Sequence, residues 1–295
     1  MALFAVDITW VVFTDFQVSV SAWPMVGGTC CALAAVAWIY TALRPSAEIA
    51  HMCLATLYMI LLTSAVAMFS YLLTSLNYPL LDAAYADADR LLGFDWLGFL
   101  AWTNDRPLLG YALTLSYHSS LAPVAVLVVL LALTSRFAQL NEFLGLFLVT
   151  ISVVIVLAGL FPAAGAYVHY NPAPELFANL NPSAGLWHLE QFTGLRDGSL
   201  RHVDLSNAEG LVTFPSFHTC LAIIVTWATR DFRWVFAATA ILNGAVIVST
   251  LPEGGHHLVD VFAGAIIAAI GIAALRAGPV FGRAPKTEQP AVSTA

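Results

Sequence analysis

The stretch Phe214-Pro215-Ser216-Phe217-His218-Thr219 stands directly after a polar segment, at the point where a long apolar run begins. A second stretch, Gly254-Gly255-His256-His257-Leu258-Val259-Asp260, holds the same position in front of the last apolar run. Ionisable side chains at the mouth of a membrane helix are costly to bury and usually serve a function. We therefore expect His218, His256 and Asp260 to meet at one face of a membrane.

Composition also indicates a polytopic membrane protein. The 295 residues are 60% hydrophobic and only 10% charged, whereas a soluble domain carries about 25% charged residues. The formal net charge of −7 argues against a nucleic-acid partner. The four cysteines lie inside apolar runs, which favours buried thiols over a disulfide framework or a metal site.

Seven apolar runs have roughly the length of about 20 residues that a membrane helix needs. They lie near residues 24–43, 49–76, 108–133, 143–160, 215–229, 234–251 and 257–275. Residues 1–23 combine aromatic side chains with Asp7 and Asp15, which favours an interfacial segment. The predicted fold class is all-α, a polytopic bundle of about six to seven transmembrane helices with interfacial helices and a long non-cytoplasmic loop. A membrane domain covers 24–276, with a catalytic core at about 140–276, and 277–295 form a disordered cytoplasmic tail.

Basic residues suggest how the bundle is oriented, because Lys and Arg accumulate on the cytoplasmic side. If the chain starts outside and crosses seven times, the inner side holds Arg44, Arg136, Arg230, Arg233, Arg276, Arg283 and Lys286. The polar segments 77–107 and 161–214 then face outward together with His218 and His256. We predict an integral protein of a bacterial-type inner or plasma membrane with its active site on the non-cytoplasmic side.

The first polar segment predicts an amphipathic helix lying on the membrane. Leu80, Leu81, Ala84, Tyr85, Ala88, Leu91 and Leu92 repeat at helical spacing, and the aspartates fall on the other face, toward water. The second polar segment contains about fifty residues rich in turn signals, which is too long for a simple connector.

The two histidine stretches together favour phosphoryl chemistry. Residues four apart share a helix face, so Asp260 can orient His256 as a nucleophile; His257, three residues before Asp260, satisfies nearly the same spacing. Pro215 and Ser216 indicate a helix start, whose free N–H groups and positive dipole favour phosphate. The expected reaction is attack on phosphorus by one histidine while the other protonates the leaving oxygen.

At these residues the chain resembles the type 2 phosphatidic acid phosphatase and haloperoxidase superfamily. Pro215-Ser216-Phe217-His218 is similar to the family's Pro-Ser-Gly-His motif, and Ser249 through His256 to Asp260 to its Ser-Arg-x5-His-x3-Asp motif. The resemblance implies His256 as the nucleophile, rather than His257, with Asp260 orienting it and His218 as general acid. It also implies that Ser216 and the backbone at Phe217 and Thr219 bind phosphate.

The chain departs from the family pattern at its cations. Thr250 replaces the arginine of the third motif, and the first motif is not recognisable before Arg106-Pro107. The candidates to bind the phosphate are Arg106, Arg201, Arg196 and His169, because they are predicted to lie on the same side of the membrane as His218 and His256. Within the family, the chain looks closest to the inositol phosphorylceramide synthase branch. The similarity lies in the pattern His256-His257-x-x-Asp260 and in Phe161-Pro162.

The predicted function is a phosphatase or phosphotransferase acting on a membrane lipid phosphate, with no cofactor and no metal. The composition leaves the oligomeric state open. The alternative is a transporter or binding protein that uses the same buried polar groups, and a metal site built from His218, His256, His257 and Asp260 is the third reading. For His257 a contact with headgroups or a loop is expected; His169, His188 and His202 are expected to be loop residues.

Overall fold

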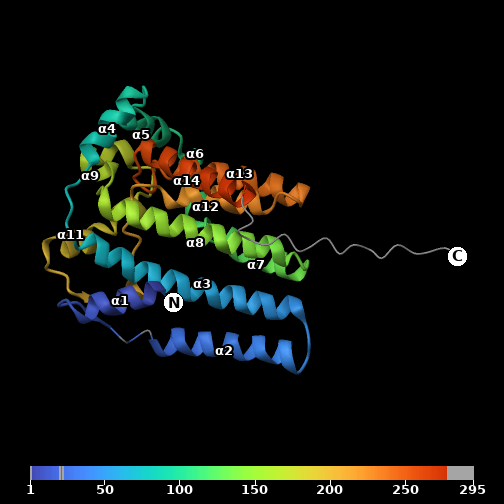
Figure 1. The fold of residues 1–295 in the computed structure, drawn as a ribbon. Coiled ribbons are helices and arrows are strands. Elements are labelled where there is room, and N and C mark those ends of the chain that lie inside the picture. Colours follow the sequence, from blue (N-terminus) through green and yellow to red (C-terminus); the bar gives the residue numbers. More distant parts are fainter. Residues whose placement is uncertain (1, 20, 22, 278–295) are drawn as a thin grey trace.

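The structure is a computed structural model that describes residues 2–19, 21 and 23–277. The predicted tail lies outside these residues, apart from Ala277. The long helices run side by side, and short helices cover one end of the bundle (Figure 1). The all-α prediction is confirmed: the regular β structure described is one parallel pairing of two-residue strands, β1 (Gln17–Val18) and β2 (His202–Val203).

Each predicted apolar run contains a helix. They are α2 (Trp23–Ala42), α3 (Ala47–Thr74), α6 (Pro107–His118) with α7 (Ala122–Leu133), α8 (Phe137–Leu160), α12 (Phe217–Ala228), α13 (Arg233–Ser249) and α14 (Leu258–Ala277). Among the described residues, α2, α3, α8 and α14 are long and apolar enough to span a membrane, and α6 with α7 makes a fifth span if the bent pair counts as one. At 12 residues α12 rises about 18 Å, well short of the bilayer core of about 30 Å.

The third predicted run is not one straight helix. It is broken after His118 and resumes at Ala122, with 51° between the two parts. Pro123 lies in the first turn of α7, where its missing N–H costs least, so the chain can restart as a helix there.

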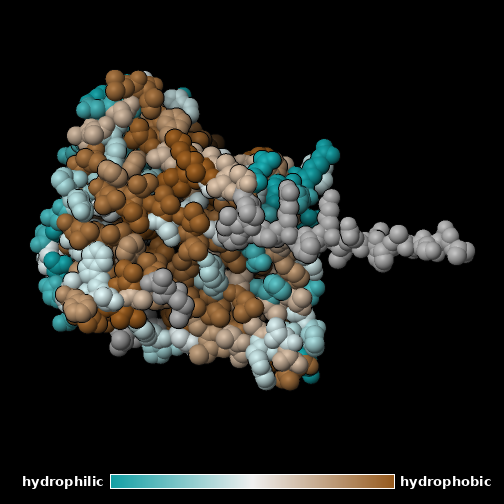
Figure 2. Space-filling model, viewed as in Figure 1, coloured by the Kyte–Doolittle hydropathy of each residue, from teal (hydrophilic) through white to brown (hydrophobic). Residues whose placement is uncertain are grey.

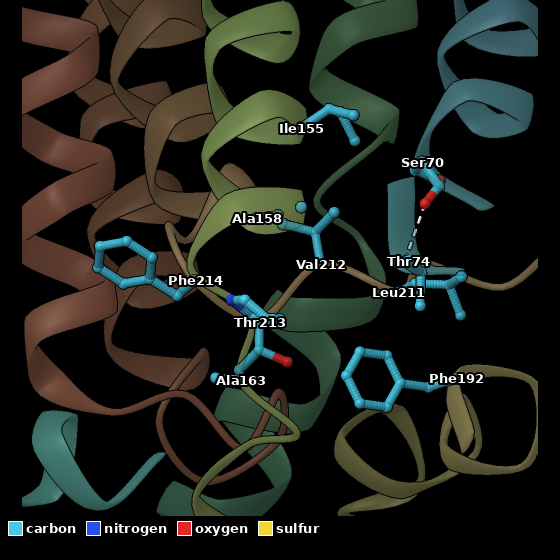
Figure 3. A pocket seen from close by; sticks show the side chains of 12 residues that line it. Ser70, Thr74, Ile155, Ala158, Ala163, Phe192, Leu211, Val212, Thr213 and Phe214 are labelled. Atoms are coloured by element: carbon cyan, nitrogen blue, oxygen red, sulfur yellow. Dashed lines mark hydrogen bonds between the residues drawn. The ribbon is translucent and has the colours of Figure 1, made fainter. Parts of the chain in front are cut away.

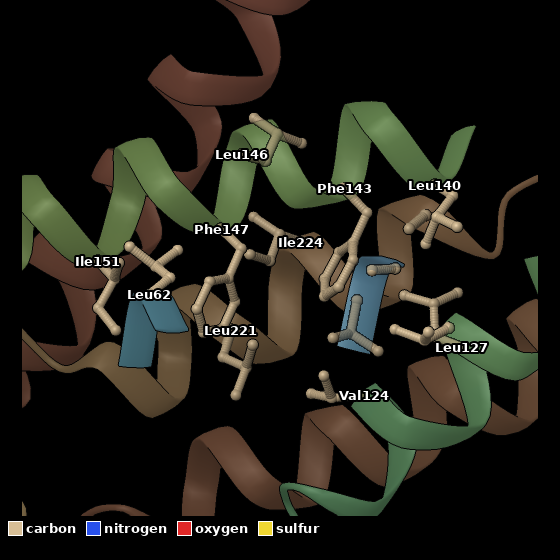
Figure 4. Close-up of a cluster of buried hydrophobic side chains, with 14 of the residues drawn as sticks. Leu62, Val124, Leu127, Leu140, Phe143, Leu146, Phe147, Ile151, Leu221 and Ile224 are labelled. Carbon is tan, nitrogen blue, oxygen red and sulfur yellow. The ribbon is translucent and has the colours of Figure 1, made fainter. Parts of the chain in front are cut away.

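The core of the bundle forms around α8. Phe143 and Phe147 project from α8 against Leu221 and Ile224 of α12, with side chains of α3 and α7 closing the cluster (Figure 4). The outer surfaces of the same helices remain apolar. Figure 2 shows a hydrophobic middle with hydrophilic residues gathered toward both ends, as expected for a protein whose belt faces lipid.

Short helices gather at the end of the bundle where α12 and α14 begin (Figure 1). They are α1 (Ala2–Val12), α4 (Asp82–Leu91), α5 (Trp96–Asn104), α9 (Ala166–Tyr170), η1 (Pro174–Phe177), α10 (Ser183–Leu186), α11 (Leu189–Asp197) and η2 (Leu205–Asn207). The segment 161–214 is therefore a folded cap of short helices and not only a chain of turns. The connections that follow α2, α7 and α12 lie at the opposite end.

One prediction about α4 is wrong. Its aspartates were expected to face water, but Asp82 is 7% exposed and Asp89 is fully buried, whereas Leu91 is 90% exposed. These two aspartates turn inward because both carboxylates accept backbone N–H groups there, while Leu91 is left on the outside. Of the three aspartates in α4, Asp87 is the one on the exposed face, beside Arg90.

Candidate active site

His256 lies in the short loop between α13 and α14, and its ring is held at both nitrogens. Nδ1 is 3.3 Å from Oδ2 of Asp260 in the first turn of α14. Nε2 is 3.4 Å from Oγ of Ser216, which precedes α12. His256 is 3% exposed and Asp260 is fully buried. A proton on Nδ1 shared with the carboxylate leaves the lone pair on Nε2, the atom that points toward α12.

Ser216 links the starts of the two helices. Its side chain accepts a hydrogen bond from the Thr219 N–H at 3.4 Å, so the predicted helix cap is present. Its backbone N–H donates to the Asp260 carbonyl oxygen at 3.0 Å. A Cβ on Gly264 would stand only 2.2 Å from the Ser216 carbonyl oxygen, so the helices approach this closely because residue 264 is glycine.

Tyr117 of α6 lies between His218 and the loop of His256. Its ring packs against the His218 ring, with centroids 4.6 Å apart and the ring planes tilted by 30°. A Cβ built on Gly254 would be 3.0 Å from both the Tyr117 ring and Cδ2 of His256. The structure therefore brings His218, His256 and Asp260 together at one end of the bundle. Tyr117 was missed because nothing in its sequence context distinguishes it from a core aromatic residue.

The loop of His256 is fixed by residues from two other segments, α5 and α9. Trp96 of α5 donates from Nε1 to the His256 carbonyl oxygen at 3.1 Å. The Ala166 N–H donates to the Gly255 carbonyl oxygen at 2.7 Å, and the Tyr167 hydroxyl donates to that of Pro252 at 2.6 Å. Gly255 has φ +64°, a conformation that side chains rarely adopt.

His257 was expected to contact headgroups or a loop, and this is wrong. It is fully buried, and its ring stands between Asp82 and Asp89 of α4. No sequence pattern indicates this burial, because the partners Asp82 and Asp89 lie far from His257 along the chain. His188 is buried as well, at 4% exposure, and burial lowers its pKa to about 4. His169 and His202 are exposed, but they lie in α9 and β2 and not in loops as expected.

The two arginines proposed for phosphate binding are engaged elsewhere. Arg106 donates to the Trp102 carbonyl oxygen at 2.6 Å and lies over the Trp102 ring. Arg201 is 3.6 Å from the Asp15 carboxylate and lies over the Phe16 ring. Their role in binding phosphate stays a prediction, as do those of Ser216, Phe217 and Thr219, which stand at the start of α12.

Glu253 is a further buried carboxyl group close to the site. It is fully buried, and Thr114 of α6 donates to its Oε1 at 2.7 Å. Burial raises its pKa. Among the described residues, no group of three or more His, Cys, Asp or Glu side chains is arranged to hold a metal ion.

A small pocket lies between α3, α8 and the segment that leads into α12 (Figure 3). Ser70, Phe192 and Phe214 are among its lining residues, and His218, His256 and Asp260 are not. The pocket is therefore separate from the histidines.

Comparison with known proteins places the chain in a family. No curated protein and no solved structure matches it. The family model described as PAP2 superfamily matches residues 83–274. That range begins in α4, ends in α14 and includes His218, His256 and Asp260. Because the match covers more than half of the chain, the protein belongs to the PAP2 superfamily.

Proposed function

We propose that this protein is an integral-membrane lipid phosphate phosphatase or phosphotransferase that works through a phosphohistidine on His256. The observation that carries the proposal is the environment of the His256 ring. Nδ1 faces Asp260 at 3.3 Å, and Nε2 faces the start of α12. A carboxylate behind an imidazole fixes its tautomer and supports the positive charge that forms during attack.

In the first step Nε2 of His256 attacks phosphorus. An N–P bond forms, the bond from phosphorus to the leaving oxygen breaks, and His218 gives that oxygen a proton. In the second step an acceptor O–H loses its proton to His218 and attacks phosphorus, and the N–P bond breaks. The free N–H groups at the start of α12 stand where they can bind the phosphate oxygens.

Water as acceptor makes the protein a phosphatase, and a lipid or polyol hydroxyl makes it a transferase. The His256-His257-x-x-Asp260 pattern and Phe161-Pro162, which resemble the inositol phosphorylceramide synthase branch, support a hydroxyl acceptor. The distribution of Lys and Arg supports a site that opens on the non-cytoplasmic side of the membrane.

The test is to trap the intermediate. Purified protein is incubated with phosphatidic acid labelled in its phosphate and quenched in alkali, where phosphohistidine survives. We expect label on the wild type that acid releases, no label on His256→Ala, and full label on His202→Ala, an exposed histidine in the same cap. Label that persists in His256→Ala would refute the assignment, and so would chelator inhibition that zinc reverses.

A further inference from the structure

We propose that His257, held between Asp82 and Asp89 of α4, is a positioning residue that fixes the catalytic loop for attack by His256. The inference rests on the proposed function and deepens it. It assigns a task to the second histidine of the pair and to an interfacial helix that contains none of the proposed catalytic residues. We call the three side chains the Asp82–His257–Asp89 cluster.

The first argument is the geometry of the cluster. Nε2 of His257 is 3.6 Å from Oδ1 of Asp82, and Nδ1 is 3.7 Å from Oδ2 of Asp89. These distances are too long for hydrogen bonds but short enough for ion pairs. A neutral imidazole has one N–H, so only the protonated ring presents an N–H to both carboxylates. Two buried carboxylates on opposite sides of one ring therefore favour the imidazolium form.

The second argument is that both carboxylates are themselves anchored to the backbone. The Leu258 and Val259 N–H groups donate to the Asp89 carboxylate at 2.8 and 2.9 Å, so Asp89 caps the start of α14. The Ala164 and Gly165 N–H groups donate to the Asp82 carboxylate at 2.9 and 2.8 Å. Helix α4 thus joins the start of α14 to the turn that follows α8.

The third argument connects the cluster to the reacting atom. The backbone N–H of His257 donates to Oδ2 of Asp260 at 2.8 Å. The same oxygen stands 3.3 Å from Nδ1 of His256. A shift of His257 therefore moves the oxygen that orients the nucleophile. In general a misplacement of about 1 Å can cost about 10²-fold in rate.

Other titratable groups around His257 are consistent with a cation there. Tyr85 of α4 and His169 and Tyr170 of α9 have ring centroids about 6 Å from its own, and Asp260 of α14 also acts on its charge. Burial alone would lower the pKa of His257, but the carboxylates outweigh it and raise the pKa to about 9. The ordinary value is 6.5, so the stabilisation is fully present below that pH and is lost as pH rises through about 9.

The experiment compares His257→Gln and Asp89→Asn with Asp87→Asn, a matched control on the exposed face of the same helix. The rate of phosphoenzyme formation is measured with labelled phosphatidic acid between pH 6 and 10, and hydrogen exchange is measured over residues 251–262. We expect Asp89→Asn and His257→Gln to slow formation by about 10- to 100-fold and to speed exchange in this segment. Asp87→Asn should match the wild type in both measurements.

The pH profile separates positioning from plain structural damage. The wild-type rate should fall as pH rises through about 9, as His257 loses its proton. In Asp89→Asn the rate should begin to fall at least one pH unit lower than in the wild type. In His257→Gln the rate should no longer fall in this alkaline range. If His257→Gln fails to fold, the isosteric Asp89→Asn decides alone.

Two failures are distinguishable. If the wild type forms no phosphohistidine, the proposed function fails, and the exchange measurement still tests the cluster. If the wild type forms one but both variants match Asp87→Asn in rate, exchange and alkaline limb, the positioning role of His257 is overturned and the proposed function stands.

Discussion

His218 and His256 occupy different surroundings, and single-residue replacements should separate their tasks. His218→Ala removes the proposed proton donor, and we expect this to slow the reaction by about 10²–10⁴-fold for a lipid leaving group. On a nitrophenyl phosphate, whose leaving group needs little protonation, His218→Ala should recover most of its rate, while His256→Ala stays inactive because no other group attacks phosphorus. Steady-state rates on both substrates check this. Equal recovery of the two variants would show that the tasks are exchanged or shared.

The sequence predicts those contacts of the candidate site that join residues close together along the chain. His256 and Asp260 are four apart, and Ser216 is three before Thr219, so helical geometry alone brings each pair together. Sequence reasoning failed for His257, Tyr117 and Glu253. The partners of His257 and Glu253 come from α4 and α6, and the partner of Tyr117 is His218 of α12. Each lies more than a hundred residues away along the chain, and no spacing rule reports such contacts.

At the scale of elements, the crossing of α12 and α14 depends on one glycine. Gly264→Ala would drive a Cβ to 2.2 Å from the Ser216 carbonyl oxygen, a backbone atom that cannot move independently. We expect it to lower the free energy of unfolding by about 1–3 kcal/mol, and to reduce activity because Ser216 faces His256. The measurement is thermal unfolding in detergent together with the rate on phosphatidic acid.

Gly244 in α13 is the matched control. A Cβ there meets nothing within 4 Å, so Gly244→Ala should stabilise the helix by about 0.5–1 kcal/mol and leave activity unchanged. If both variants behave alike, the close approach of α12 and α14 does not control the site.

The hydrophobic pattern predicted where the helices lie better than it predicted which face of a helix is buried. The predicted apolar runs agree within two residues with α2, α3, α13 and α14, because a span of that length leaves few alternatives to a helix, whereas α8 begins six residues before its predicted run. In α4, the prediction that Asp82 and Asp89 face water is wrong. Amphipathic patterning assumes that carboxylates prefer water, and Asp82 and Asp89 instead find backbone N–H groups in the interior.

At the scale of the whole molecule, the arrangement of helix ends makes the orientation testable. Ser199 is exposed in the cap, and Thr134 is exposed at the opposite end of the bundle. With the four native cysteines replaced by alanine, Ser199→Cys should react with an impermeant maleimide added to intact cells. Thr134→Cys should react only after the membrane is opened. The reverse pattern would place the histidines on the cytoplasmic side.

The contact between Asp89 and the start of α14 has a consequence for how the protein is made. The N–H groups that Asp89 accepts belong to residues 169 and 170 positions further along the chain. Helix α4 therefore leaves the ribosome long before α14, and the Asp89 carboxylate lacks these two backbone partners until α14 has been made. Because the same contact holds the loop of His256, the proposed nucleophile can be fixed in place only after the last helix has been made.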